Sequence, residues 1–233
     1  MNGKMKNPFR ELTRFEWVLW ISSLVVVSAS YLLAPDRDFV TLLTSLVGVT
    51  ALIFVAKGHV LGQMLCVVFA VAYGVISFYF RYYGEMITYL GMSAPSAVAA
   101  TVSWLKNPYR ETAEVKVSTV TGKRFALVLV LTAVVTGAFY FILRALNTAN
   151  LFFSTLSVAT SFLASALTIL RSPWYAIAYS ANDLVLIVLW ALASVEDISY
   201  LPMIFCFIMF LGNDLYGFFN WQRMKKRQIL ENL

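Results

Sequence analysis

Apolar runs of about 20 residues recur along nearly the whole chain, and this feature restricts its fold most strongly. Charged and turn residues separate eight such runs, at 15–34, 38–56, 59–80, 84–104, 125–143, 150–170, 174–193 and 200–221. A helix of about 20 residues crosses the hydrocarbon core of a bilayer, and it satisfies its backbone hydrogen bonds internally. No strand-like alternation competes with this pattern. The sequence therefore predicts an all-α integral membrane protein with eight transmembrane helices.

The composition argues against a soluble domain. Hydrophobic residues make up 60% of the chain, compared with roughly 45–50% in soluble domains, and the mean hydropathy is +0.75. The net charge of +6 is not read as a nucleic-acid signal, because the basic residues form short clusters beside the apolar runs, as topology signals do. Cys66 and Cys206 lie inside apolar runs, where we expect small hydrophobic side chains. No metal, no cofactor and no nucleic-acid partner is expected.

The positive charges predict the orientation, because cytoplasmic connections carry most Lys and Arg residues. With the N-terminus inside, all but three of the 18 Lys and Arg residues fall on the cytoplasmic side, and the exceptions are Arg37, Arg81 and Arg144. Ser28-Ala29-Ser30 faintly resembles a signal-peptidase site, but the first run is long enough to span. We expect a retained first helix and two cytoplasmic termini.

A polar connection at 105–124 divides the chain into two halves. Each half holds a triplet of similar runs, and Trp104 and Trp221 close the two triplets. Parallel repeats of this kind are a known transporter plan, with the substrate site near the membrane midplane between the repeats. The predicted organisation is an N-terminus with an extra helix (1–37), a first triple-helix bundle (38–104), a cytoplasmic loop with a linker helix (105–149), a second bundle (150–221) and a basic cytoplasmic tail (222–233).

Two Asn-Asp pairs, Asn182-Asp183 and Asn213-Asp214, lie within the last two runs. Ionisable side chains at that depth mark a site or a pathway by default. Each pair lies eight residues from a tryptophan, Trp174 or Trp221, which is about 12 Å along a helix. The pairs are therefore expected at one level, slightly inward of the midplane. The alternative is that each carboxylate only supports helix packing.

Helical spacing gathers aromatic and amide side chains around both pairs. Amides and carboxylates flanked by aromatic rings suit a planar, hydroxylated ligand, and the carboxylates and ring faces favour a cation. The candidate ligand-binding residues are Trp174, Tyr175, Tyr179, Asn182, Asp183, Asn213, Asp214, Tyr216 and Asn220. The candidate gate or pore residues are Tyr73, Glu85, Trp104 and Trp221.

Enzymatic chemistry is not expected, and no catalytic residue is predicted. The sequence has no paired metal-ligand spacing, no Gly-rich phosphate loop and no nucleophile with a plausible base. Asp183 and Asp214 lack the sequence context of an intramembrane aspartyl protease. The hydroxyl residues between Ser154 and Thr168 are interpreted mainly as packing groups, and Gln63 as a solvated side chain near the inner interface.

Several motifs together resemble a known family. They are Ser172-Pro173-Trp174-Tyr175, Asn182-Asp183, Trp190, the run Asn213-Asp214-Leu215-Tyr216-Gly217-Phe218-Phe219-Asn220-Trp221, Gly48-Val49, Lys57-Gly58, Tyr83-Gly84-Glu85 and Trp104. These residues resemble the PnuC-type nicotinamide riboside transporters over about 40–225. The resemblance implies a 3+1+3 helix arrangement like that of the SWEET proteins, and a homotrimer in the lipid of the bacterial plasma membrane. It also implies facilitated diffusion of nicotinamide riboside, trapped by a separate cytoplasmic kinase that feeds NAD biosynthesis.

One position departs from the family pattern Trp-x-x-Trp-x-x-x-Asn/Asp. Trp174 is followed by Ile177 and Ala181, and the amide comes one residue later, at Asn182. Either a neighbouring tyrosine replaces the second indole, or the ligand differs. Similar groups carry thiamine, riboflavin or deoxynucleosides, so these remain alternative ligands. A membrane-embedded enzyme or scaffold remains the alternative of a different class.

Overall fold

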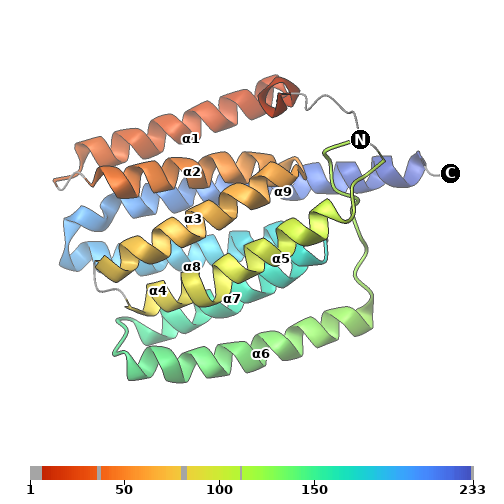
Figure 1. The fold of residues 1–233 in the computed structure, drawn as a ribbon. Coiled ribbons are helices and arrows are strands. Elements are labelled where there is room, and N and C mark those ends of the chain that lie inside the picture. Colours follow the sequence, from red (N-terminus) through yellow and green to blue (C-terminus); the bar gives the residue numbers. More distant parts are fainter. Residues whose placement is uncertain (1–6, 36–37, 80–82, 111, 232–233) are drawn as a thin grey trace.

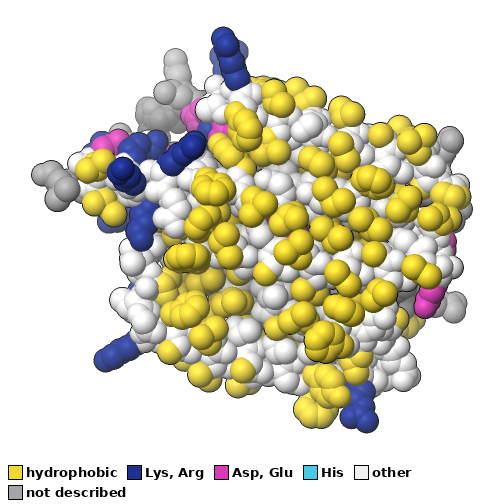
Figure 2. Space-filling view, turned by 180° about the vertical axis from the view of Figure 1, so that it is seen from behind, with side chains coloured by type: hydrophobic (Ala, Val, Ile, Leu, Met, Phe, Trp, Pro, Cys, Tyr) yellow, Lys and Arg dark blue, Asp and Glu magenta, His cyan; other side chains and the backbone are white. Residues whose placement is uncertain are grey.

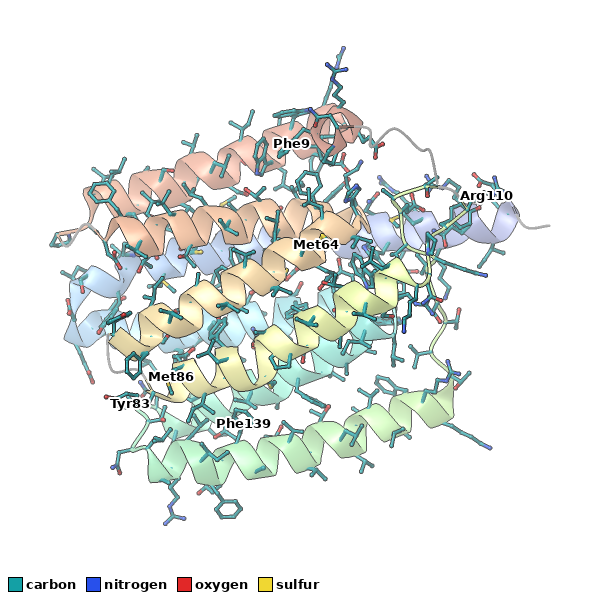
Figure 3. The ribbon with its side chains drawn as sticks, viewed as in Figure 1. Phe9, Met64, Tyr83, Met86, Arg110 and Phe139 are labelled. Carbon is teal, nitrogen blue, oxygen red and sulfur yellow. The ribbon has the colours of Figure 1, made fainter. Side chains whose placement is uncertain are left out.

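The computed structural model describes residues 7–35, 38–79, 83–110 and 112–231. Its long helices run side by side, and both ends of the chain lie at one end of the bundle (Figure 1). This end is named the terminal end, and Arg110 lies there, whereas Tyr83 lies at the opposite end (Figure 3).

Seven helices in these ranges are long and apolar enough to cross a membrane. They are α1 (Arg14–Leu33), α2 (Phe39–Ala56), α3 (Val60–Tyr79), α6 (Gly122–Ala145), α7 (Leu151–Ile169), α8 (Tyr175–Glu196) and α9 (Leu201–Leu230). Two short 3-10 turns, η1 (Pro8–Glu11) and η3 (Ile198–Tyr200), lie before α1 and between α8 and α9. The predicted all-helical membrane fold is confirmed, although α9 continues through the basic tail that we expected to follow it.

The fourth predicted run, 84–104, is not one regular helix. It consists of α4 (Tyr83–Thr88), the π-helical turn η2 (Tyr89–Ser93) and α5 (Ala94–Leu105). The backbone N–H of Ala94 donates to the carbonyl of Tyr89, five residues earlier, and Pro95 in the first turn of α5 has no N–H to donate. The described part of the chain therefore contains seven continuous candidate spans and one interrupted segment, rather than eight regular helices.

Two sets of helices form the centre of the bundle. In the first set α3 packs against α2 and α5, and in the second set α8 packs against α7 and α9. The sets meet where α2 contacts α9 and α5 contacts α7, while α1 packs on α2 and α9, and α6 packs on α7 (Figure 1). The space between the two sets is therefore walled by both halves of the sequence.

The connection between α5 and α6 crosses the terminal end and joins both sets. The backbone N–H of Val115 donates to the carbonyl of Gly58 after α2, and that of Ser118 donates to the carbonyl of Arg171 after α7, each over 2.9 Å. Gln228 of α9 donates its side-chain amide to the Val115 carbonyl at 3.0 Å. This loop thus ties three elements together.

The surface has the charge distribution of a membrane-spanning protein. Apolar side chains cover the flank of the bundle, and most of the Lys and Arg side chains visible on that face gather at the terminal end (Figure 2). Large side chains of α6 such as Val130 and Phe141 are 60% and 67% exposed, as lipid-facing residues would be. Lys4, Lys6, Arg37 and Arg81, which contributed to the predicted orientation, lie outside the described residues.

Gly62 allows α3 to approach the backbone of α2 closely. A Cβ atom there would collide with the backbone nitrogen of Val55 and lie 2.8 Å from the carbonyl carbon of Phe54. We expect Gly62→Ala to lower the free energy of unfolding by about 1–3 kcal/mol, because backbone atoms cannot rotate away. The thermal unfolding transition of purified protein in detergent measures this. Gly137→Ala on α6, where a Cβ meets nothing within 4 Å, is the matched control, and equal transitions for both variants would contradict the prediction.

Candidate functional site

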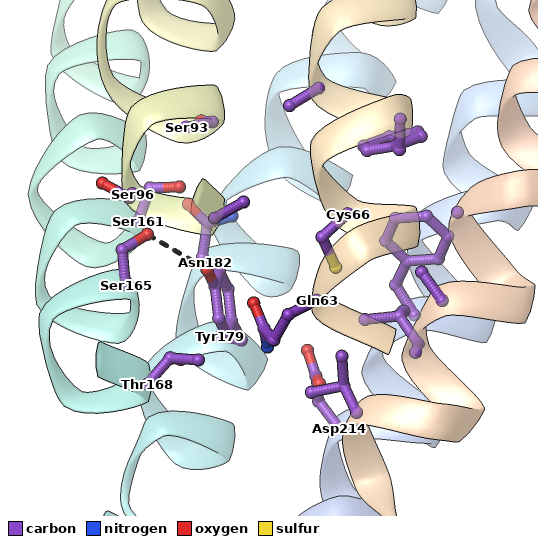
Figure 4. A pocket seen from close by; sticks show the side chains of 18 of the residues that line it. Gln63, Cys66, Ser93, Ser96, Ser161, Ser165, Thr168, Tyr179, Asn182 and Asp214 are labelled. Atoms are coloured by element: carbon purple, nitrogen blue, oxygen red, sulfur yellow. Dashed lines mark hydrogen bonds between the residues drawn. The ribbon is translucent and has the colours of Figure 1, made fainter. Parts of the chain in front are cut away.

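The two sets of helices enclose a central cavity of about 110 Å³ (Figure 4). Its apolar wall includes Phe69, Phe207 and Phe210. Its polar lining includes Gln63, Tyr89, Ser93, Ser96, Ser161, Ser165, Thr168, Tyr179, Asn182, Asp183 and Asp214. Four predicted ligand-binding residues thus meet in one cavity, namely Tyr179, Asn182, Asp183 and Asp214.

Hydroxyl groups of α7 orient the amide and the phenol of α8. Thr160 Oγ1 donates to Asn182 Oδ1 over 2.9 Å, and Ser165 Oγ lies 3.0 Å from Tyr179 OH (Figure 4). Because its oxygen is already an acceptor, Asn182 has its Nδ2 group left to donate to a ligand. The α7 hydroxyls, which we interpreted mainly as packing groups, thus also shape the cavity.

Asp183 of α8 and Asp214 of α9 form a buried carboxyl pair. Both residues line the central cavity, and they are 3% and 4% exposed. Oδ2 of Asp183 has no hydrogen-bond partner within the described ranges, so an acceptor remains for a ligand. No group of His, Cys, Asp and Glu in these ranges is arranged to hold a metal ion.

Three other predicted ligand-binding residues point elsewhere. Asn213 turns toward α1, where its Nδ2 donates to Ser23 Oγ at 3.0 Å. Trp174 is 56% exposed and packs on Phe218, with 5.4 Å between the ring centroids. Tyr175 is fully buried and packs on Trp221, with 4.9 Å between the ring centroids. None of the three lines the central cavity.

Tyr216 and Asn220 line a second cavity, of about 460 Å³, at the terminal end. Tyr216 OH donates to Glu16 Oε1 over 2.7 Å, and Glu16 is ion-paired with Lys57 at 3.1 Å between Nζ and Oε2. Asn220 Nδ2 donates to the carbonyl of Ala56 at 2.9 Å. In this conformation these two residues therefore join α9 to α1 and α2, rather than facing the central cavity.

Trp104 and Trp221 close the central cavity toward the terminal end. Trp104 Nε1, from the first set, donates to the Thr168 carbonyl of the second set at 3.0 Å. Trp221 Nε1, from the second set, donates to the Val55 carbonyl of the first set at 2.9 Å. The two rings are fully buried, and their centroids lie 5.3 Å apart. The two indoles do not line the cavity themselves, but Thr168 and Val55 do, so the indoles lie directly behind its lining toward the terminal end and are named the indole floor.

The residues next to these tryptophans repeat the reciprocal pattern. Ser103 Oγ donates to the carbonyl of Ile169 at 2.7 Å, as Asn220 does to Ala56. The last carbonyls of a helix have no partner within the helix. Each set therefore uses two adjacent residues of its third segment, α5 or α9, to cap the end of the other set's first helix.

The remaining gate candidates lie toward the opposite end. Tyr73 is buried in the core, with its ring centroid 4.4 Å from that of Tyr89, and it does not line the central cavity. Glu85 in the first turn of α4 lines a third cavity of about 300 Å³.

Several cavity residues of the first set were not predicted. Gln63, which we placed in water near the inner interface, is 4% exposed and lines the central cavity. Tyr89, Ser93 and Ser96 line it from the π turn and the start of α5. Pro95 inside an apolar run was the available signal, because proline interrupts a helix and π turns often occur at functional sites.

Comparison with known proteins agrees with this architecture. A family model described as nicotinamide mononucleotide transporter matches residues 38–223. The nicotinamide riboside transporter PnuC of Neisseria mucosa is 27% identical over 220 residues, which cover 92% of this chain and 83% of the relative. The chain belongs to the PnuC transporter family. PnuC of Haemophilus influenzae is 24% identical over 213 residues, or 90% of this chain and 91% of that relative.

A solved PnuC structure has the same fold as this family member. The crystal structure of a vitamin B3 transporter PnuC is similar, with a TM-score of 0.80 and 27% identity over 93% of this chain and 94% of that one. The protein is therefore a multi-pass membrane transporter and not an enzyme. Helix α1 precedes the residues that the family model matches. It packs against α2 and α9.

Proposed function

We propose that this PnuC-family protein carries nicotinamide riboside across the membrane. The observation that carries the proposal is the central cavity, in which Tyr179, Asn182 and the Asp183–Asp214 pair meet between the two sets of helices. Two relatives have this ligand in their names.

The chemistry of the cavity matches a pyridinium nucleoside. A negative charge on the Asp183–Asp214 pair complements the single positive charge of the pyridinium ring. The Asn182 amide and the hydroxyls of Ser161 and Ser165 can hydrogen-bond to ribose or to the carboxamide. The ring of Tyr179 offers an aromatic surface to the cation, and we propose that it replaces the second indole of the family pattern.

We propose a 3+1+3 arrangement in which 38–104 and 150–221 form two parallel triple-helix bundles. In this arrangement α6 is the linker, α1 is an eighth span outside the repeats, and α4, η2 and α5 together make one span. Support comes from the reciprocal capping by Trp104 and Trp221, since corresponding positions of two repeats make corresponding contacts. We propose uniport by rocking of the bundles about the cavity, with trapping of the product by a separate cytoplasmic kinase.

We also propose that the terminal end faces the cytoplasm of a bacterial cell. The Lys and Arg residues gathered at that end support this orientation in the plasma membrane (Figure 2). The indole floor then closes the cavity on the cytoplasmic side. A homotrimer embedded in lipid is proposed from the family resemblance.

Isothermal titration of the detergent-purified protein tests the ligand. We expect saturable binding of nicotinamide riboside, and none of thiamine, riboflavin or a deoxynucleoside under the same conditions. Binding of one of those three instead would keep the site and change the ligand. Binding of none of the four compounds would contradict the proposed function.

A further inference from the structure

A separate cavity at the opposite end of the bundle lies where the outer mouth of the carrier would be. It has a volume of about 300 Å³ and is formed by the start of α4, the turn between α6 and α7, and the faces of α7 and α8. Its polar lining includes Glu85, Asn147, Asn150, Ser154 and Trp190.

This outer cavity continues the central one along three helical segments. On α8, Asp183 and Leu186 line the central cavity and Trp190 lines the outer one. On α7, Ser161 lines the central cavity and Ser154, two turns earlier, lines the outer one. Residues spaced by three, four or seven share one face of a helix. A single face of α8 and a single face of α7 therefore lead from one cavity to the other.

The first set supplies a third such face. Tyr89 in the π turn lines the central cavity, and Glu85, four residues earlier, lines the outer one. Gly84 beside it packs tightly against the α6–α7 turn, because a Cβ there would lie 2.8 Å from Thr148 Oγ1. Both sets thus meet around the outer cavity as they do around the central one.

The outer cavity contains polar groups without partners in the described part of the chain. Trp190 is 8% exposed, and its indole N–H is buried without a hydrogen-bond acceptor. A buried donor without an acceptor is costly, so a ligand that accepts from it would be stabilised. The Glu85 carboxylate makes no hydrogen bond or ion pair within the described ranges. Asn150 makes no side-chain capping bond at the start of α7.

We propose that this outer cavity is a capture site for a cationic, hydroxylated aromatic ligand before it reaches the central cavity. Glu85 supplies the negative charge, the Trp190 N–H donates to a carbonyl or hydroxyl oxygen, and the Asn147 and Asn150 amides bind hydroxyl groups. The proposal rests on the proposed transport of a pyridinium nucleoside. The outer cavity is thus a second ligand site. It increases the rate at which the ligand enters the central cavity, and it does not increase the equilibrium affinity of the central cavity.

The charge balance around the cavity is consistent with this role. Glu85 is the only acidic or basic residue among the described residues that line the cavity. The nearest basic residue in the sequence of the α6–α7 turn, Arg144, is exposed and does not line it. A single charge in a partly enclosed cavity is screened less by salt than a fully exposed one, and it attracts a cation to the mouth.

Stopped-flow tryptophan fluorescence of the full-length protein in detergent tests the capture site. We expect Glu85→Gln to lower the association rate constant for nicotinamide riboside about threefold to tenfold, with a parallel fall in the dissociation rate constant. The equilibrium affinity should change less than about twofold. Glu196→Gln is the matched control, because Glu196 ends α8 and is exposed, and it should leave both rates unchanged. Glu85→Asp, which keeps the charge, should keep most of the association rate.

Two further measurements test whether Glu85 acts through its charge or through the shape of the cavity. Dihydronicotinamide riboside has the same sugar but an uncharged ring, and Glu85→Gln should not slow its association. Added salt should slow association of the cation with the wild-type protein more than with Glu85→Gln. Coincident rates for Glu85→Gln and Glu196→Gln, or equal slowing of the charged and uncharged ligands, would overturn the proposal. Failure of the proposed function is distinct, because the wild-type protein would then not bind nicotinamide riboside at equilibrium.

Discussion

Asn182→Ala is expected to weaken the binding of nicotinamide riboside about 10- to 100-fold, because it removes an amide that lines the central cavity. Loss of one buried hydrogen bond to a ligand costs roughly 1–3 kcal/mol. Thr160 loses its acceptor on Asn182, but its hydroxyl also lies 3.0 Å from the carbonyl of Leu156 in its own helix and donates there instead. The variant should therefore fold, and isothermal titration of the monodisperse protein measures the change in affinity.

Asn213→Ala is the matched control, since it makes the same substitution at the corresponding position of the other Asn-Asp pair. The sequence alone predicts that both amides bind the ligand. In the structure Asn213 instead donates to Ser23 and to the carbonyl of Met209, so we expect a less stable protein with an affinity within about twofold of the wild type. Equal losses of affinity in the two variants would contradict the assignment.

The double variant Trp104→Phe/Trp221→Phe is expected to open the cavity toward the terminal end. It keeps two aromatic rings but removes both indole donors to Thr168 and Val55. At about 1 kcal/mol for each hydrogen bond, the closed state loses about 2 kcal/mol, which increases the open population roughly 30-fold. Cys66 lines the cavity and reports the opening through its labelling rate.

The labelling uses a membrane-impermeant thiol reagent in inside-out vesicles. The only other cysteine, Cys206, is buried and is replaced by alanine in every protein compared. Trp17→Phe is the control, because Trp17 is 37% exposed on α1 and does not line the central cavity. If Cys66 reacts at the same rate in the double variant and in this control, the indoles are not the closing element.

The helical spans and the meeting of Asp183 with Asp214 could be predicted because they depend on regular geometry. A run such as 174–193 is long and apolar enough that the bilayer allows little except a helix. Along such a helix the depth of a residue follows from its distance to an interfacial tryptophan. Eight residues separate Trp174 from Asn182 and Asn213 from Trp221, so the two carboxyl groups were expected at one level.

The direction in which each side chain points could not be predicted in the same way. Asn213 and Asp214 are adjacent, and a helix turns about 100° between them; only Asp214 lines the cavity, although both residues of the pair Asn182 and Asp183 do. Which of Asn213 and Asp214 does so depends on the placement of α1, whose Ser23 accepts from Asn213. Similarly, Tyr179 lines the cavity while Tyr175 is packed below it, with its ring centroid 4.9 Å from that of Trp221. Single-helix spacing does not contain this information.

The interrupted fourth segment shows a second limit. The average hydropathy over 84–104 predicts one regular transmembrane helix. It contains no information on the π turn or on Pro95, which change the relative orientation of the residues on either side. Tyr89 and Ser93, at the two ends of that turn, line the cavity as a result. Such cavity-lining positions depend on a local irregularity of the backbone, and an average over the composition of the segment cannot reveal it.

The acceptors in the indole floor are main-chain oxygen atoms of Val55 and Thr168. Any amino acid at either position would present the same oxygen, so substitutions there can alter the lining of the cavity without removing the acceptor of the closing bond. Substitution therefore leaves the acceptors of the closure in place, and it removes closing bonds only at the donors, which are Trp104, Trp221 and their neighbours Ser103 and Asn220. In a carrier built in this way, residues of the cavity wall near the indole floor can be replaced to suit another ligand while the same hydrogen bonds still close the cavity.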